Sequence, residues 1–121
     1  MKIILVIDDE PVIRASIEVI LNQKGFNAIT AKNGAIGLQL AKERIPDLIV
    51  CDVMMPVLDG YGVLSALRED PTTAAIPFIF LTGNTDSDSQ SQGMALGAND
   101  YLTKPLMQKD LLKTISTYLI D

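Results

Sequence analysis

Three uninterrupted apolar segments restrict the fold of this chain more than any other feature of its sequence. They are Ile3–Ile7, Leu48–Cys51 and Phe78–Leu81, and none of them alternates apolar with polar residues. A strand with one face in water shows such alternation, whereas a strand buried on both faces does not. We therefore expect three central strands of a parallel sheet. Two weaker strand candidates are Asn27–Ala31 and Asp100–Thr103.

Helical periodicity fills the intervals between these strands. Proline suits a first helical turn and glycine a C-terminal stop, so both residues mark helix ends. The predicted helices start at Pro11, after an Asn33-Gly34 cap, at Gly60 and near Met107, and the first three stop before Gly25, Pro46 and Asp70-Pro71. Their apolar stripes are Ile13, Ile17, Ile20 and Leu21 in the first, Leu38, Ala41 and Ile45 in the second, and Leu111, Ile115 and Leu119 in the last.

The segment Thr85–Gly93 is unusual, because it reads TDSDSQSQG and no apolar residue precedes Met94 and Leu96. Serine, aspartate and glycine have low helix propensity. We interpret the segment as a marginal helix that is able to shift. An ordinary exposed helix start, capped by Asp86 or Ser87, is an equally good interpretation.

Strand and helix alternate five times within 121 residues, a length that suits a single domain over residues 1–121. The alternation predicts an α/β fold in which a parallel sheet carries helices on both faces. The length favours a flavodoxin-like, doubly wound sheet of five strands in the order 2-1-3-4-5, with five helices.

Composition excludes several classes of function. The net charge of −5 without a basic cluster argues against direct nucleic-acid binding, and the absence of histidine removes Ser-His-Asp triads and most zinc sites. The single cysteine, Cys51, lies inside an apolar strand, and we expect it in the core of a cytoplasmic protein. The N-terminus, MKIILVIDDE, turns acidic too early for a signal peptide or membrane insertion.

Polar residues follow four of the predicted strands at the point where each strand ends. They are Asp8-Asp9-Glu10, Asp52, Thr82-Gly83 and Lys104-Pro105. In open parallel sheets, ligands bind beyond the carboxyl ends of the strands, where the strand order reverses. We therefore expect these residues to share one crevice.

The acids in this crevice require a cation. Two carboxylates about 5 Å apart repel each other by roughly 3 kcal/mol at an effective dielectric constant near 20. Lys104 can offset only one of the three charges of Asp8, Asp9 and Asp52. Mg²⁺ suits such a site better than Ca²⁺, because it needs few protein carboxylates and keeps water positions for a phosphate. Zinc is disfavoured without histidine and with only one thiol.

This arrangement predicts phosphoryl transfer. Asp52 is the nucleophile and becomes an acyl phosphate, while Lys104 offsets charge on the phosphoryl oxygens. The Thr82 hydroxyl can bond the bound group, and Gly83 leaves it room. Each residue has an ordinary explanation when it is taken singly; Asp9, for example, can be only a helix cap. Their joint placement at the strand ends favours a functional site.

Five motifs together resemble the receiver domain of bacterial two-component response regulators, the chemotaxis regulators included. They are DDE at Asp8–Glu10, DVMMP at Asp52–Pro56, DG at Asp59-Gly60, FLTG at Phe80–Gly83 and GANDYLTKP at Gly97–Pro105. The resemblance covers essentially the whole chain. It implies that Asp52 is the phosphoacceptor, that Asp9, Asp52 and the backbone carbonyl of Met54 bind Mg²⁺ directly, and that Asp8 binds it through water. Mn²⁺ is the implied substitute.

The resemblance also implies a switch. Thr82 and Lys104 would sense the phosphoryl group, and Tyr101 would turn inward when Thr82 closes on it. The Lys104–Pro105 peptide bond would be cis. Three residues are implied to tune the lifetime of the phosphate: Met54, Gly83 and Asn84.

The implied partners are a sensor histidine kinase or a histidine phosphotransfer protein, and a downstream effector. The effector would bind the surface formed by the fourth helix, the fifth strand and the fifth helix. A phosphorylation-dependent homodimer is a further expectation. The chain would catalyse only its own phosphorylation and dephosphorylation. We expect no output domain in this chain, which is either a stand-alone receiver or part of a larger protein.

Three alternatives are open at the level of sequence. A Mg²⁺-dependent phosphohydrolase would need a second acid two residues after the nucleophile, where this chain has Met54. A flavodoxin-like flavin or nucleotide module would need a Ser/Thr/Gly-rich loop after the first strand, where the chain reads DDEPV. The third alternative is an interaction domain with an inert site.

Overall fold

The structure is a computed structural model that describes residues 1–83 and 87–119. Within this part of the chain, strands and helices alternate as the sequence predicted. The elements are β1 (Ile3–Ile7), α1 (Pro11–Gln23), β2 (Asn27–Ala31), α2 (Gly34–Arg44), β3 (Leu48–Asp52), α3 (Gly60–Glu69), β4 (Phe78–Thr82), α4 (Ser87–Ala95), β5 (Asp100–Thr103) and α5 (Gln108–Tyr118).

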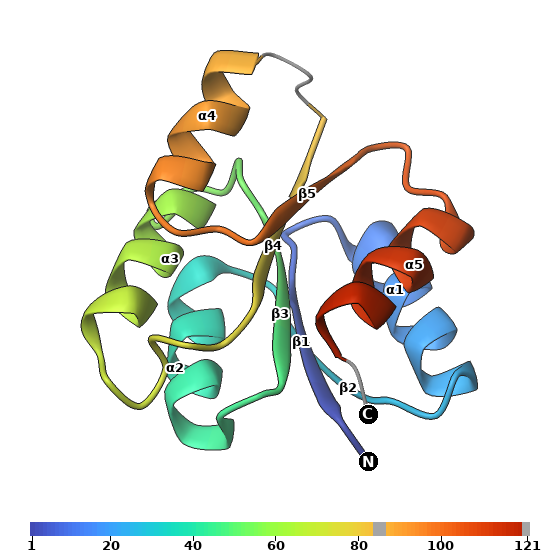
Figure 1. Cartoon of the computed structure of the whole chain (residues 1–121). Coiled ribbons are helices and arrows are strands. Elements are labelled where there is room, and N and C mark those ends of the chain that lie inside the picture. Colours follow the sequence, from blue (N-terminus) through green and yellow to red (C-terminus); the bar gives the residue numbers. More distant parts are fainter. Residues whose placement is uncertain (84–86, 120–121) are drawn as a thin grey trace.

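The strands form one parallel sheet in the order β2-β1-β3-β4-β5, which confirms the predicted topology. The helices form two layers: α2, α3 and α4 cover one face of the sheet, and α1 and α5 cover the other (Figure 1). Because all strands are parallel, their carboxyl ends lie at the same edge. The strand order reverses between β1 and β3, and this is where the crevice was expected.

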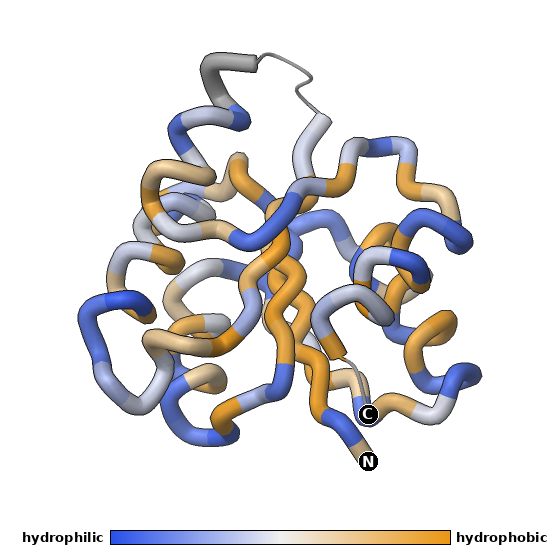
Figure 2. The backbone as a smooth tube through the Cα atoms, viewed as in Figure 1, coloured by the Kyte–Doolittle hydropathy of each residue, from blue (hydrophilic) through white to orange (hydrophobic). Residues whose placement is uncertain are grey.

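The central strands are buried on both faces, as their unbroken apolar sequences predicted (Figure 2). Leu5 and Ile7 of β1 pack in the cluster under α2 and α3, whereas Ile4 and Val6 of the same strand pack in the cluster under α1 and α5. Cys51 is fully buried in the first cluster, which confirms that it is a core residue.

Local signals set several helix ends. Pro11 opens α1, and Gly25, with a φ of 88°, follows it in the left-handed region that favours glycine. The Asn33 side chain caps α2 by accepting a bond from the backbone N–H of Ile36 (2.8 Å). The N-cap of α1 is Glu10 rather than Asp9, so the alternative that Asp9 is only a helix cap is wrong.

Ile45 was predicted to belong to the apolar stripe of α2, and this prediction is wrong. The helix ends at Arg44, and Ile45 is the C-cap with a φ of 43° and 44% of its surface exposed. Small residues make the contact with the sheet instead, since a Cβ at Gly37 would lie 2.7 Å from Ile7 Cγ1. The bulk at this contact comes from the strand, whereas Leu38 and Ala41 of the predicted stripe do pack in the core cluster.

The expected polar helix is α4, and its described part begins at Ser87. The predicted start at Thr85 and the cap at Asp86 lie outside the described residues, and so does the side chain of Ser87. No helix in the described part of the chain combines the length and the apolar character needed to cross a bilayer.

Candidate functional site

The ends of β1 and β3 bring acidic side chains together. Asp8 follows β1 and is fully buried, while Asp52 ends β3 with 4% of its surface exposed. Asp9 and Glu10 continue from Asp8 and are exposed. One carboxylate oxygen from each of these four residues lies within 4.8 Å of the others. Asp8, Asp9 and Asp52 therefore converge as the positions of the strand ends predicted.

Backbone contacts hold the two buried acids in place. Asp8 Oδ1 accepts a hydrogen bond from the backbone N–H of Glu10 (2.9 Å), and Asp52 Oδ1 accepts one from the N–H of Met54 (3.4 Å). Gly60, the first residue of α3, lies directly against the carbonyl oxygen of Asp52, where a side chain would collide. The glycine thus lets α3 begin immediately behind the acid.

Lys104 reaches the acids from the end of β5. Its Nζ donates to Glu10 Oε1 at 2.8 Å and lies 3.4 Å from Asp52 Oδ2 and 3.5 Å from Asp8 Oδ2. The Lys104–Pro105 peptide bond is cis, the geometry that the resemblance implied. One ammonium group therefore faces three carboxylates, which leaves the site with excess negative charge.

The charges and burial shift the pKa values of two groups. Burial, followed by the charge of Asp8, raises the pKa of Asp52 to about 6, although Lys104 and the N–H of Met54 act in the opposite direction. Burial lowers the pKa of Lys104, but its bond to Glu10 and the nearby carboxylates outweigh that effect and raise it overall. The charge of Asp8 in the first shift and the carboxylates in the second are consistent with an excess of negative charge at the site.

Glu10 is a contact residue to which sequence reasoning assigned no role. The DDE run placed it near the site, but the strand ends predict only which residues are close to one another. Which acid bonds Lys104 depends on the reach of the side chains, and the longer, half-exposed Glu10 provides the shortest contact.

The acid cluster has the chemistry of a magnesium site. Its ligand atoms are all carboxylate oxygens, which Mg²⁺ prefers. Asp8 Oδ2 is buried, and no hydrogen-bond partner for it exists among the described residues. A buried carboxylate oxygen without such a partner is costly, and a bound cation would satisfy it. The residues that are present therefore fit Mg²⁺.

Two further residues with a predicted role lie between this site and α4. Thr82 ends β4, directly after Leu81, which pairs with Asp52 in the sheet, and it is 3% exposed. Tyr101 of β5 is half-buried, with its ring centroid 5.7 Å from that of Phe80, and its hydroxyl donates to the carbonyl oxygen of Gln90 in α4. Burial, with Tyr61 nearby, raises the pKa of Tyr101 above its ordinary value.

The residues that the resemblance linked to phosphate lifetime lie on the rim. Met54 is 76% exposed, and Gly83 is exposed with open space where a side chain would be. Asn84 lies outside the described residues.

Comparison with known proteins identifies the family. Residues 4–116 match the family described as the response regulator receiver domain. The chain is 37% identical over 119 residues to the protein PilH of Pseudomonas aeruginosa, and the match covers 98% of both chains. It spans about half the length of several transcriptional regulators that it also matches.

Two solved structures share the fold over nearly the whole chain. The chemotaxis protein CheY4 of Vibrio cholerae has a TM-score of 0.94 and 33% identity, covering 98% of this chain and 99% of that one. The receiver domain of the sensor histidine kinase PA1611 of Pseudomonas aeruginosa has a TM-score of 0.89 and 29% identity, with 97% and 96% covered. That domain was solved with a magnesium ion coordinated in its active site cleft.

These relatives do not favour the phosphohydrolase, the flavin or nucleotide module or the inert interaction domain. They agree with the acid cluster at the strand ends and with the fold. The chain belongs to the family of response regulator receiver domains and is a phosphorylation-dependent signalling switch.

Proposed function

We propose that Asp52 is the phosphoacceptor of this switch. The observation that carries the proposal is the place of Asp52: its carboxylate is nearly buried at the end of β3, yet it lies within the acid cluster and 3.4 Å from Lys104. A carboxylate in this position has a cation beside it and lies next to the exposed residues of the acid cluster, Asp9 and Glu10. We propose that residues 1–121 act as one receiver domain.

The transfer step is a displacement at phosphorus. A carboxylate oxygen of Asp52 forms a bond to phosphorus as the bond from phosphorus to the imidazole nitrogen of a phosphohistidine breaks. The nitrogen keeps the electron pair and takes a proton from water. Lys104 would offset charge on the phosphoryl oxygens, and the Thr82 hydroxyl would donate to one of them.

The metal would be held by Asp9, Asp52 and the backbone carbonyl of Met54, with Asp8 bound through a water molecule. When bound, Mg²⁺ offsets negative charge on the incoming phosphoryl group, and Mn²⁺ would substitute for it. The buried Asp8 Oδ2 supports this assignment, because it accepts no hydrogen bond from the described residues and has only the Lys104 ammonium group 3.5 Å away.

Phosphorylation would act on the surface through Thr82 and Tyr101. Thr82 would close on the phosphoryl group, and this would favour the inward position of Tyr101 against Phe80, which the structure already has without a phosphoryl group. Met54, Gly83 and Asn84 would tune how long the phosphate lasts.

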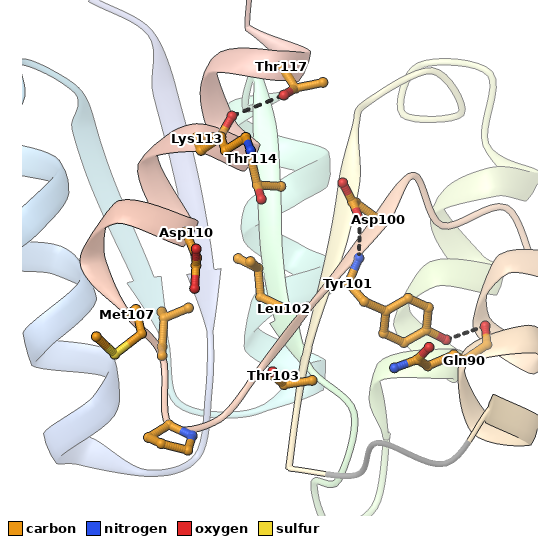
Figure 3. A pocket seen from close by; sticks show the side chains of 12 residues that line it. Gln90, Asp100, Tyr101, Leu102, Thr103, Met107, Asp110, Lys113, Thr114 and Thr117 are labelled. Atoms are coloured by element: carbon orange, nitrogen blue, oxygen red, sulfur yellow. Dashed lines mark hydrogen bonds between the residues drawn. The ribbon is translucent and has the colours of Figure 1, made fainter.

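The effector would bind across α4, β5 and α5. A groove of about 660 Å³ lies on this surface, with Gln90 and Tyr101 at one side and Met107, Asp110 and Lys113 at the other (Figure 3). A phosphorylation-dependent homodimer would use the same surface. The phosphoryl donor would be a sensor histidine kinase or a histidine phosphotransfer protein in the cytoplasm, and the chain would catalyse only its own phosphorylation and dephosphorylation.

The test is incubation with acetyl phosphate and Mg²⁺, followed by intact-mass measurement. The wild type is expected to gain the mass of one phosphoryl group, and Asp52→Asn to gain none. Asp47→Asn is the matched control, since it makes the same change next to the opposite end of β3, where Asp47 accepts a bond from the N–H of Ile3 (2.7 Å). Modification of Asp52→Asn to the same extent as the wild type would refute the proposal.

A further inference from the structure

The helix α4 is attached to the sheet differently from an ordinary amphipathic helix. Among the side chains described in it, from Gln90 to Ala95, only Gly93 is buried, and Met94 is 48% exposed. Apolar burial normally holds a helix on a sheet. The described part of this helix has no such stripe, and the nearest apolar contacts lie just past its carboxyl end, where Leu96 and Ala98 pack in the core cluster.

Gly93 is the point of closest approach between α4 and the sheet. A Cβ placed on it would lie 2.8 Å from Phe80 Cε2 and 3.0 Å from Phe80 Cδ2, and still closer to the Tyr101 hydroxyl oxygen. A real Cβ does not come that close, so any side chain at this position requires either Tyr101 or the helix to move. The glycine leaves the space that the phenol end of Tyr101 occupies.

A hydrogen bond lies beside this contact. The Tyr101 hydroxyl donates to the carbonyl oxygen of Gln90, which is one turn before Gly93 on α4 (Figure 3). The ring also packs on Phe80, which lies two residues before Thr82 on β4. The phenol of Tyr101 therefore contacts the strand that carries Thr82 and the helix of the proposed effector surface.

The carboxyl end of α4 is fixed independently. The backbone N–H of Ala98 bonds the Gly93 carbonyl (3.1 Å), and the N–H of Gly97 bonds that of Met94 (3.0 Å), a helix-ending pattern. The Arg68 guanidinium of α3 holds the Gly97 carbonyl through two nitrogens, at 3.3 and 3.0 Å. Because this end is tied to α3, a bulkier residue at position 93 would displace the turn that contains Gln90 or expel Tyr101.

We propose that Gly93 is a positioning residue for Tyr101: its missing side chain admits the phenol between Phe80 and α4, so that the helix and Tyr101 keep one joint position. The role of this contact in signalling rests on the proposed function, because it acts through the proposed switch residue Tyr101. The contact itself exists without phosphorylation and can be tested without it.

The first experiment compares Gly93→Ala with Gln92→Ala in the unphosphorylated protein. Both changes raise helix propensity in α4, but only the first adds an atom against Tyr101, since Gln92 is exposed. The probe is NMR of ¹³C-labelled tyrosine rings, with the Tyr101 signals assigned by Tyr101→Phe. In Gly93→Ala we expect the Tyr101 signals to move toward those of an exposed tyrosine and its pKa to fall toward about 10. In Gln92→Ala both should stay as in the wild type.

Unchanged Tyr101 signals and an unchanged Tyr101 pKa in Gly93→Ala would exclude a displaced ring and leave only a displaced helix. If Gly93→Ala displaces the helix instead of Tyr101, the displacement still results from the collision of the added Cβ with the Tyr101 hydroxyl. The Tm change caused by Gly93→Ala should therefore be less unfavourable in a Tyr101→Phe background. Equal Tm changes in both backgrounds, together with unmoved ring signals, would show that the glycine has no role here.

The test of Gly93 can succeed or fail independently of the test of Asp52. Gly93→Ala should still gain one phosphoryl group from acetyl phosphate, because none of the acid-cluster residues contacts position 93. A wild type that gains no phosphoryl group would refute the role of Asp52 but leave the NMR comparison intact. A phosphorylated wild type, combined with unmoved Tyr101 signals and equal Tm changes for Gly93→Ala in both backgrounds, would refute only the inference on Gly93.

Discussion

The helices α3 and α4 cover the same face of the sheet, yet they are held there by different kinds of contact (Figure 1). The helix α3 buries Val63, Leu64 and Leu67 in the core cluster. Of the residues 90–95 in α4, only Gly93 is buried, and the helix accepts a bond from Tyr101 through a backbone carbonyl. The two neighbours therefore differ in what it costs to move them.

Apolar burial and polar contact respond differently to a local change. Each buried leucine contributes about 2 kcal/mol or more and fits closely against its neighbours, so α3 cannot shift without losing much of that free energy. A single hydrogen bond contributes about 1 kcal/mol. A helix attached mainly by such contacts can change position for a free energy that phosphorylation is able to supply, since charge-assisted bonds are of that order.

The largest effect is expected in α3. Leu67→Ala removes a fully buried side chain and should lower the free energy of unfolding by about 3 kcal/mol, because it loses apolar contact and leaves a cavity. Urea denaturation followed by circular dichroism measures this change. A loss below about 1 kcal/mol would mean that α3 is not held by its core contacts, and the comparison with α4 would fail.

The second-largest effect is expected at the strand ends, where a buried carboxylate and not apolar packing determines the free energy. The pKa of Asp52 is about 6 in the folded protein, against about 3.9 in an unfolded chain. Between these values the folded protein keeps a proton that the unfolded chain has released. Stability therefore falls as pH rises from about 4 to 6, and the penalty is fully present above that range.

Asp52→Asn removes this penalty. A shift of two pK units corresponds to about 3 kcal/mol, from which the lost contact with Lys104 must be subtracted. We expect the metal-free variant to be about 2 kcal/mol more stable than the wild type at pH 7 and to lose the pH dependence between 4 and 6. Urea titrations at several pH values, with a chelator present, measure both. Equal stability at pH 7 would indicate that Asp52 is not electrostatically strained.

The fold was predictable because its strands are buried on both faces and its helix ends carry strong signals. A strand such as Ile3–Ile7 fills the core on both faces of the sheet, so its sequence is uniformly apolar. The acid cluster was predictable because the carboxyl ends of parallel strands lie at one edge of the sheet. This places Asp8, Asp52 and Lys104 together independently of their side-chain conformations.

Side-chain reach and local volume were not predictable from pattern alone. The bond between Glu10 and Lys104 depends on the length of both side chains. Ile45 looked like a stripe residue, but the helix ends at Arg44 and Ile45 is its C-cap, with a positive φ. The contact at Gly93 was missed because the sequence shows a polar helix with a glycine and does not show what lies beneath it.

A smaller effect is expected where α4 meets Tyr101. Tyr101→Phe removes the hydroxyl bond to the Gln90 carbonyl and should lower the free energy of unfolding by about 1 kcal/mol, because one half-buried bond is lost. Amide hydrogen exchange in α4 should quicken by about fivefold, and exchange in α3 should change less. Equal acceleration in both helices would indicate that α4 unfolds only together with the core.

The smallest effect is expected from Met94→Ala, which makes the same kind of truncation on α4 that Leu67→Ala makes on α3. Met94 is 48% exposed, so its loss should change the free energy of unfolding by no more than about 0.5 kcal/mol. Measuring both variants in the same urea series makes the comparison direct, since each substitution ends in alanine within a helix on the same face. A loss above about 1 kcal/mol for Met94→Ala would mean that α4 is held by apolar burial after all. The helix would then resist displacement as α3 does, and a shift driven by Tyr101 would require more free energy than the contacts at Thr82 and Lys104 can supply.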